Sequence, residues 1–371
     1  MLGVVVIVHE LGHYLAGRLF DAAVESYSVG FGKSIYERTD SRGTRWRVNR
    51  FPIGGFVKFV GESQLAGDVG KNEQGLVGKA FPDLGVGQRS IISLAGPMAN
   101  FVLASLLFAL MAGVNGKPRS DLSISQVVAE TPAAVAGFEI GDILKTIEGK
   151  PIRNSNDFTM PIALGTGVDI PVELERDGEL ITVNVIPERR DSQNGLGQTV
   201  KIGTIGVQLS ATNFEMQHYG PIGALREGVT ETVNTLSVTV HMLGRMVTGK
   251  EPLSNLSGPV GIGDITRRAV NQTLGAEGHP LSTRLAAMMW IIIHLCALIS
   301  VGIGLFNLLP LPVLDGGHLV FNAYEAVTGK VLPEKIQEAS LTFGLVFLIG
   351  MAIIITWGDI IETGIFKGSG G

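Results

Sequence analysis

Two histidines and a glutamate near the start of the chain are the residues best suited to do chemistry. His9 and His13 lie four positions apart in the sequence HELGH, with Glu10 between them. On a helix, residues four apart project from one face about a turn apart, so both imidazoles can bind one Zn²⁺ while the carboxylate acts on a water molecule. The pattern indicates metal-assisted hydrolysis of a peptide bond, with Glu10 as the catalytic residue.

The motif lies in an apolar segment, where ionisable residues are rare. Residues 2–20 form an apolar run about as long as a membrane-spanning helix. An HExxH match often arises by chance in a soluble sequence, but charged and ionisable side chains inside a membrane are costly and normally functional. The sequence therefore predicts that hydrolysis takes place within the bilayer.

A catalytic zinc usually has three protein ligands and one open position, so a third ligand is expected. The candidates near apolar segments are Asp315, His318, His294 and Asp359. Asp315 is favoured because it follows prolines that must break a helix, and because a carboxylate at membrane depth is costly unless a cation pairs with it. The alternative for Asp315 is a simple Asp-Gly turn. His318 remains an alternative ligand, whereas His294 is expected to be a packed residue.

Other residues near the motif are candidates for binding substrate. Asn307 carries an amide at membrane depth, which either holds the substrate backbone or bonds a broken helix. Asn100, after Gly96, is either a helix-packing feature or an amide that contacts the metal-binding helix. Residues 34–48 are typical of a hairpin and 55–60 of a further strand; they are either plain cytoplasmic structure or a sheet edge that presents substrate in extended form. The strand candidates are Gly54, Gly55, Phe56 and Val57.

Composition indicates a membrane protein. The mean hydropathy is +0.33 and only 17% of the residues are charged. Uncharged stretches at 90–116, 285–314 and 339–358 are long enough to span a bilayer, which makes four spans with the first run. The net charge of −5, without a basic patch, argues against a nucleic-acid partner. Arginines and lysines between residues 22 and 89 favour the cytoplasmic side for that segment.

A soluble-looking module occupies residues 121–209. Strand patterns at 124–129, 143–147, 170–174 and 181–186 surround the segment TPAAVAGFEIGDILKTIEGKPI. Modules of this kind capture peptide ends by adding a strand to an open sheet edge. After it, apolar residues at helical spacing over 222–246 predict an amphipathic helix that lies against the membrane or the module.

Five ordered motifs carry a family resemblance. HELGH, GPMANF at 96–101, the single PDZ-like module, SGPVGI at 257–262 and NLLPLPVLDGGH at 307–318 together closely resemble bacterial site-2 proteases of the regulator-of-sigma-E type. The resemblance implies one zinc per chain on His9, His13 and Asp315, and substrate handling by the segment that includes Asn307 and Pro310. Well-known relatives carry two PDZ domains in tandem, so a size filter that needs a tandem pocket is not carried over to this chain.

The resemblance also implies a location, partners and a reaction. Such enzymes are intramembrane zinc metalloproteases of the bacterial inner membrane, with periplasmic PDZ domains. They cleave single-pass transmembrane substrates, such as anti-sigma factors or signal-peptide remnants, and lipid surrounds them. A catalytically silent scaffold whose PDZ-like module docks peptide termini is the alternative, but it would need no general base. A metal transporter is less favoured, because no internal repeat is visible.

The expected fold is a polytopic α-helical membrane protein with four transmembrane helices, a membrane-associated β region and one inserted PDZ-like α/β domain. In chain order the expected segments are 1–20, the first span with HELGH; 21–88, the cytoplasmic-side β region; 89–116, the second span; 117–212, the periplasmic PDZ-like domain; 213–284, amphipathic helices and linker; 285–314, the third span ending in the LDG motif; 315–338, a loop; and 339–371, the fourth span and tail.

Overall fold

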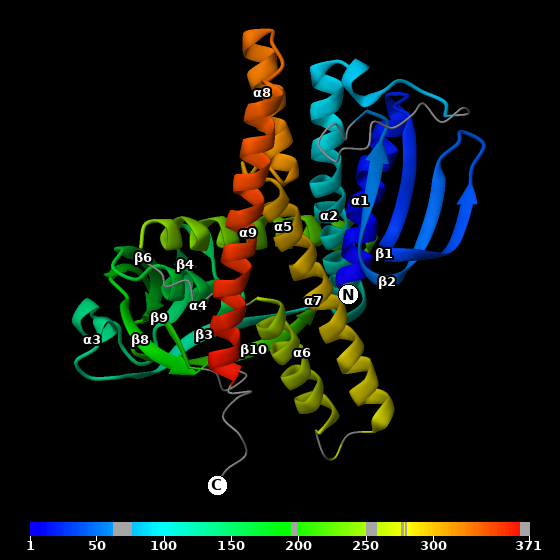
Figure 1. Ribbon diagram of the computed structural model, residues 1–371. Helices are drawn as coiled ribbons and strands as arrows, with labels where there is room; N and C mark the ends of the chain where they lie inside the picture. Colours follow the sequence, from blue (N-terminus) through cyan, green and yellow to red (C-terminus); the bar gives the residue numbers. More distant parts are fainter. Residues whose placement is uncertain (62–75, 194–198, 250–257, 276–277, 279, 364–371) are drawn as a thin grey trace. The chain divides into compact units, whose positions relative to one another are not determined.

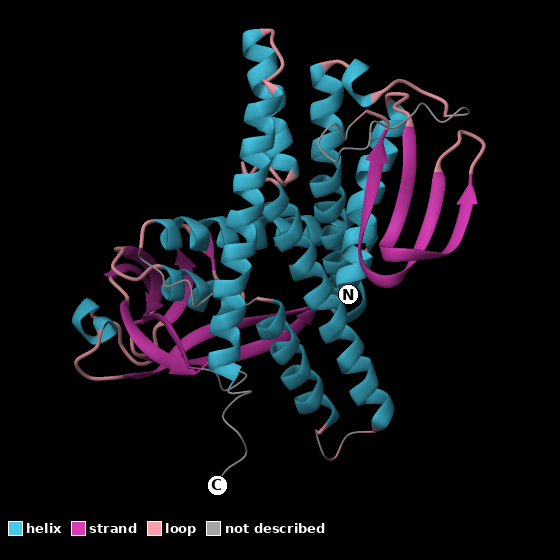
Figure 2. Ribbon diagram, viewed as in Figure 1, coloured by secondary structure: helices cyan, strands magenta, loops and turns pink. Residues whose placement is uncertain are grey.

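The computed structural model describes residues 1–61, 76–193, 199–249, 258–275, 278 and 280–363. The chain forms two compact units: one contains residues 1–110, 225–239 and 257–371, and the other contains 111–224 and 240–256. Figure 1 labels the helices and strands along the chain, and Figure 2 separates them by type. The tail beyond residue 363 lies outside the described residues.

The first unit is mainly helical. Its helices are α1 (Leu2–Leu19), α2 (Val86–Asn115), α6 (Pro259–Leu274), α7 (Leu281–Asn307), α8 (Asp315–Thr328) and α9 (Glu334–Thr363), with a short 3₁₀ turn at Phe81–Asp83. Within the described part of the chain, three helices are long and apolar enough to cross a membrane, at Val86–Asn115, Leu281–Asn307 and Lys335–Ile360. The helix α1 is not among them, because its histidines, glutamate and arginine lower its mean hydropathy. The expectation of four spans is therefore not confirmed.

Small residues bring α1 close to its neighbours. Its buried residues recur every fourth position, at Val5, His9, His13 and Gly17, and so form one stripe. A Cβ on Gly12 would lie 2.4 Å from the carbonyl oxygen of Ala95 on α2. Only glycine permits this approach, so α1 and α2 are in backbone contact beside the HELGH motif.

The β region follows α1. The strand β1 (Val24–Thr39) and the strand β2 (Arg45–Phe59) are antiparallel, as the predicted hairpin requires. Residues 24–29 pair with 45–48 on one side and with 55–59 on the other, so the predicted strand at 55–60 is the second half of β2 and forms an edge of the sheet. Gly54, with φ of +85°, precedes that edge.

Asp40 holds the hairpin turn. Its carboxylate accepts hydrogen bonds from the backbone N–H groups of Arg42 and Thr44 and from the Trp46 indole. Burial alone would raise the pKa of Asp40, but these hydrogen bonds outweigh it and hold the pKa below its ordinary value. The turn of the hairpin predicted at residues 34–48 is therefore stabilised by its own side chain.

The second unit is a sheet with two helices. Its sheet has the order β10-β3-β4-β6-β7, with β5 beside β4, and all pairs are antiparallel. The strands are β3 (Lys117–Val127), β4 (Ile143–Ile147), β5 (Lys150–Pro151), β6 (Ile170–Arg176), β7 (Glu179–Val185) and β10 (Val207–Gln217). The helices are α3 (Pro132–Ala136) and α4 (Ser155–Leu164), and β8 (Glu188–Gln193) pairs with β9 (Thr199–Thr204). The core includes Leu122, Ile147, Phe158, Ile170 and Leu174.

The predicted amphipathic helix is α5 (Pro221–Val247), and it has three faces. One face is buried and includes Ala224, Gly228 and Thr232; Gly228 packs against Ser105 and Ala109 of α2. A second face carries exposed polar residues such as Arg226 and Asn234. The third face is apolar and exposed, and consists of Ile222, Leu225, Val229, Val233, Val240 and Val247.

The chain leaves the helical path between α7 and α8, which corrects two expectations. The helix α7 ends at Asn307, and α8 begins at Asp315, because prolines at 310 and 312 supply no N–H group and their rings block a continuous helix. The third span therefore does not extend to residue 314, and residues 315–338 are not a loop, since most of them belong to α8 and to the start of α9. A Cβ on Gly316 would lie 2.1 Å from the carbonyl oxygen of Leu309, so glycine lets α8 start against the irregular segment.

Candidate metal centre

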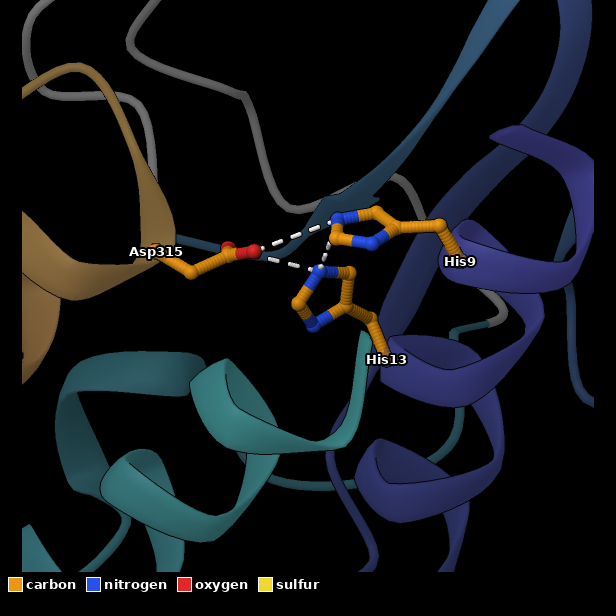
Figure 3. Close-up of side chains that lie close together, drawn as sticks. All are labelled: His9, His13 and Asp315. Atoms are coloured by element: carbon orange, nitrogen blue, oxygen red, sulfur yellow. Dashed lines mark hydrogen bonds and ion pairs between the residues drawn. The ribbon is translucent and has the colours of Figure 1, made fainter. Parts of the chain in front are cut away.

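His9, His13 and Asp315 converge on one point, although about 300 residues separate the histidines from the aspartate in sequence. The Nε2 atom of His9 lies 3.1 Å from Asp315 Oδ2, and His13 Nε2 lies 3.3 Å from Asp315 Oδ1. The two Nε2 atoms are 3.1 Å apart. Figure 3 shows both rings, which come from α1, facing the carboxylate at the start of α8.

The spacing of these atoms fits zinc. Nitrogen and oxygen ligands about 2.0–2.1 Å from a tetrahedral zinc would lie about 3.3 Å from one another. The three observed separations are 3.1, 3.1 and 3.3 Å. Asp315 Oδ2 is also buried and makes no well-directed hydrogen bond, although His9 Nε2 lies 3.1 Å away, as expected where ligand atoms surround a cation. The donor set of two imidazoles and one carboxylate is one that catalytic zinc sites use.

Gly96 of α2 makes room for the rings. A Cβ on Gly96 would lie 2.3 Å from His13 Nε2 and 2.8 Å from His9 Cε1. Any larger residue would push the ligand atoms apart. The glycine that the sequence placed in GPMANF is therefore part of the site.

The backbone of α2 orients His13. The ring Nδ1 of His13 lies 2.8 Å from the carbonyl oxygen of Ile92, which can only accept a hydrogen bond. His13 therefore carries a proton on Nδ1, which leaves Nε2 as the ring atom that can bind a metal. The ring of His9 has a different neighbour, the side-chain amide of Asn100, whose Nδ2 lies 3.2 Å from His9 Nδ1.

Glu10 lies beside the cluster and contacts the sheet edge. Its Oε2 accepts a hydrogen bond of 2.9 Å from the backbone N–H of Val57. A Cβ on Gly55 would lie 3.6 Å from Glu10 Cγ, and Tyr27 Oη donates to the carbonyl oxygen of Ile7 at 2.8 Å. These contacts hold both strands of the β region, including the edge of β2, against α1 next to the candidate base.

A cavity of about 260 Å³ opens onto these groups. Three of the predicted substrate residues, Phe56, Val57 and Asn307, line it, whereas Gly54, Gly55 and Pro310 do not. The rest of the lining consists of His9, Glu10, His13, Phe59, Phe81, Ile92, Ser93, Val313, Leu314, Asp315 and His318. Sequence reasoning missed Phe59, Phe81 and Ser93, because no local pattern marks them.

The other candidate ligands lie outside the three-residue cluster. His318 lines the cavity one turn after Asp315 and packs edge-on against Phe321. His294 packs edge-on against Phe108, as expected of a packed residue. The carboxylate of Asp359 accepts hydrogen bonds from the backbone N–H groups of Gly258 and Gly261. Of the four candidates, only Asp315 lies within reach of both imidazoles.

This chain is similar over most of its length to one family of peptidases. The model of peptidase family M50 matches residues 1–351. The metalloprotease MmpA of Caulobacter vibrioides is 36% identical over 387 residues, which cover 100% of this chain and 96% of that protein. Proteins that carry the name of a zinc metalloprotease, Atu1380 of Agrobacterium fabrum and BR1156/BS1330_I1152 of Brucella suis, are each 35% identical over 97% of this chain and 93% of their own length.

Proposed function

The chain belongs to peptidase family M50, the site-2 proteases, and is a zinc metalloendopeptidase; from this premise we propose that it hydrolyses peptide bonds within the transmembrane segments of single-pass proteins. Anti-sigma factors or signal-peptide remnants are the proposed substrate types, in regulated intramembrane proteolysis. The observation that carries the proposal is that His9, His13 and Glu10 lie on a mainly apolar helix in backbone contact with the candidate span α2. A catalytically silent scaffold would need neither the metal ligands nor the general base.

In this proposal His9, His13 and Asp315 hold the zinc, and Glu10 is the general acid and base. Zinc, when bound, supplies Lewis acidity that activates water and polarises the scissile carbonyl. Glu10 takes the proton of the attacking water and passes it to the leaving amine. The two carboxylates, of Glu10 and Asp315, balance the charge of a dication, which makes burial of the group in an apolar setting tolerable.

The edge strand of β2 is the proposed substrate-binding element. A substrate helix satisfies its own amides, so it must unwind before attack, and each backbone group left unpaired in lipid costs several kcal/mol. The N–H of Val57 points away from β1 and toward Glu10, so this edge offers backbone partners beside the base. Phe56, Val57 and Asn307, which line the cavity, would hold the unwound segment. Gly54, Gly55 and Pro310 do not line the cavity, so they would act only by shaping the backbone beside it.

The second unit is proposed as the PDZ-like domain, on the periplasmic side of a bacterial inner membrane. Its antiparallel sheet and two helices support this assignment. It would bind peptide termini or exclude substrates that still carry a folded extracellular domain. Comparing the cleavage of one substrate with and without that domain tests the role, since equal rates would contradict both versions.

The proposed reaction is tested with purified protein in liposomes that contain a single-pass substrate. Cleavage is expected inside the apolar segment of the substrate, as mapped by mass spectrometry of the products. Treatment with 1,10-phenanthroline should abolish cleavage, and added Zn²⁺ should restore it, because the ligand set holds an exchangeable metal. Cleavage confined to the segments outside the bilayer, or activity that persists after zinc is removed, would contradict the proposal.

Proline substitutions test the role of the edge strand. Phe56→Pro and Val57→Pro are expected to slow cleavage of a membrane substrate about tenfold or more. Val57→Pro removes a backbone donor at the open edge, and Phe56→Pro disturbs the pairing with β1 that holds the edge in place; one lost backbone partner is worth more than the 1.4 kcal/mol that corresponds to a factor of ten. Zinc content should not change. The matched control is Ile35→Pro, at an exposed position of β1 without a pairing partner in the sheet.

A short water-soluble peptide distinguishes strand addition from damage to the base. We expect its cleavage to be affected much less, since it needs no unwinding. Equal loss on both substrates would mean that the prolines act through Glu10, and unchanged cleavage of the membrane substrate by both variants would exclude strand addition.

A further inference from the structure

One face of α2 serves both imidazoles. Ile92, Gly96 and Asn100 are spaced four residues apart, so they lie in one row along the helix. The Ile92 carbonyl accepts from His13, Gly96 leaves space for both rings, and the Asn100 amide reaches His9. Since the order of contacts runs from His13 to His9 as α2 proceeds, the two helices are antiparallel here, and each ring has its own partner on α2.

We propose that Asn100 is the positioning residue of His9. Its side-chain carbonyl oxygen accepts a hydrogen bond from His9 Nδ1–H and thereby keeps His9 Nε2 unprotonated and aimed at the zinc position. The proposal rests on the proposed function and deepens it, because it names the residue that makes His9 a competent ligand.

A neutral imidazole that binds metal through Nε2 carries its proton on Nδ1, and that proton needs an acceptor. An amide presents a donor on one side and an acceptor on the other, and the choice between them follows from the hydrogen bonds available. With Nδ2 toward the ring, Asn100 Oδ1 is buried without a partner. After a half-turn of the amide, Oδ1 accepts from His9 Nδ1–H and Nδ2 takes the buried position that Oδ1 held. Either orientation makes one hydrogen bond to the ring, but only the turned one suits a ring that carries its proton on Nδ1.

The position of Asn100 is fixed from two sides. The residue is fully buried, with 0% of its surface exposed. Its backbone carbonyl accepts a hydrogen bond of 2.8 Å from Ser300 Oγ on α7, and Ser300 is also fully buried. One turn later on α7, Gly304 packs closely against Phe101 and the carbonyl oxygen of Pro97. The amide is therefore held between α1 and α7 and has little freedom to leave the ring.

The residue type also favours a role beyond packing. A buried amide in an apolar helix is costly unless it is hydrogen-bonded, and a leucine would fill the same space at no such cost. Ile92 and Asn100 would thus each accept a hydrogen bond from the Nδ1–H of one ring, Ile92 through its backbone oxygen and Asn100 through its side-chain oxygen.

The test compares Asn100→Leu, which removes the acceptor, with Asn100→Asp, which keeps one. Zinc affinity, measured by competition with a chromogenic chelator, is expected to fall about 10–100-fold in Asn100→Leu and to stay close to the wild type in Asn100→Asp. The absorption spectrum of Co²⁺-substituted protein should change in Asn100→Leu only. Asn100→Ala is measured in parallel in case leucine impairs folding. Ser105→Ala, a buried change on the same helix that contacts Thr232 instead of the rings, is the control.

The outcomes separate this inference from the proposed function. Zinc affinity in folded Asn100→Leu and Asn100→Ala equal to that of Ser105→Ala would overturn the positioning role. Loss of affinity in Asn100→Asp as large as in Asn100→Leu would also overturn it, because packing would then explain both. Wild-type protein that binds no zinc would defeat the proposed function itself, whereas zinc-binding wild type with unaffected Asn100 variants would defeat only this inference.

Discussion

Glu10→Gln is expected to reduce peptide-bond hydrolysis about 10²–10⁴-fold, the usual contribution of a general acid–base group. The amide cannot take a proton from water, but its oxygen can still accept the hydrogen bond from Val57, so the edge strand should stay in place. Glu10 is not one of the three clustered ligand residues, and zinc content should therefore remain near one per chain. Initial rates on a membrane substrate, together with metal analysis, measure both quantities.

The control for this change is Glu37→Gln. Glu37 lies on the exposed part of β1 and pairs with Arg47, away from the cavity. Its variant should retain the wild-type rate and zinc content. Activity of Glu10→Gln within a few-fold of the wild type would remove Glu10 from the mechanism, and loss of zinc together with activity would make it part of the metal site instead.

Asp315→Asn should lose both zinc and turnover. The substitution keeps the size of the side chain but removes the only anionic member of the three-residue cluster, so two neutral imidazoles would hold the cation without charge compensation. We expect the protein to be purified with far less than one zinc per chain, and cleavage to fall at least as far as in Glu10→Gln. Metal analysis after dialysis, and titration of the remaining affinity, provide the measurement.

Asp359→Asn is the matched control, because Asp359 is another buried carboxylate in an apolar helix that the sequence offered as a ligand. Its oxygens accept from the backbone N–H groups at the start of α6, and the substituted amide keeps an acceptor for one of them. This variant should keep its zinc. Full zinc occupancy in Asp315→Asn, or equal loss in the two variants, would show that the third ligand lies elsewhere.

Features that depend on a few neighbouring residues could be predicted from the sequence. Two imidazoles four residues apart on a helix must face the same way, and the apolar run around them favours that helix. The turn at Asp40 and the end of α7 before the prolines follow from the same short-range chemistry. The strands expected at 143–147, 170–174 and 181–186 correspond to β4, β6 and β7, since alternation of apolar residues reports directly on a half-buried strand; the strand expected at 124–129 is only the end of β3, which begins at Lys117.

Features that depend on contacts between distant segments could not be predicted from the sequence. The sequence predicted a loop from residue 315, but α8 forms there, because Gly316 and Gly317 can pack against the backbone of the preceding segment. Nothing local separates Gly54 and Pro310, which do not line the cavity, from Phe56 and Asn307, which do. The contributions of Ser93, Phe59 and Phe81 likewise follow from the packing of α2 and the β region around α1.

The class of chemistry could be predicted from local residues: two imidazoles and a carboxylate at helical spacing in an apolar run suit a metal-dependent peptidase, because the helical repeat fixes their relative positions. The packing of the helices was needed to find which of four distant residues completes the ligand set, and to place Gly96 and Asn100 of α2 beside it. This division follows from the range of the interactions. Backbone geometry acts over a turn or two, whereas the meeting of His9 with Asp315 depends on how separate helices pack.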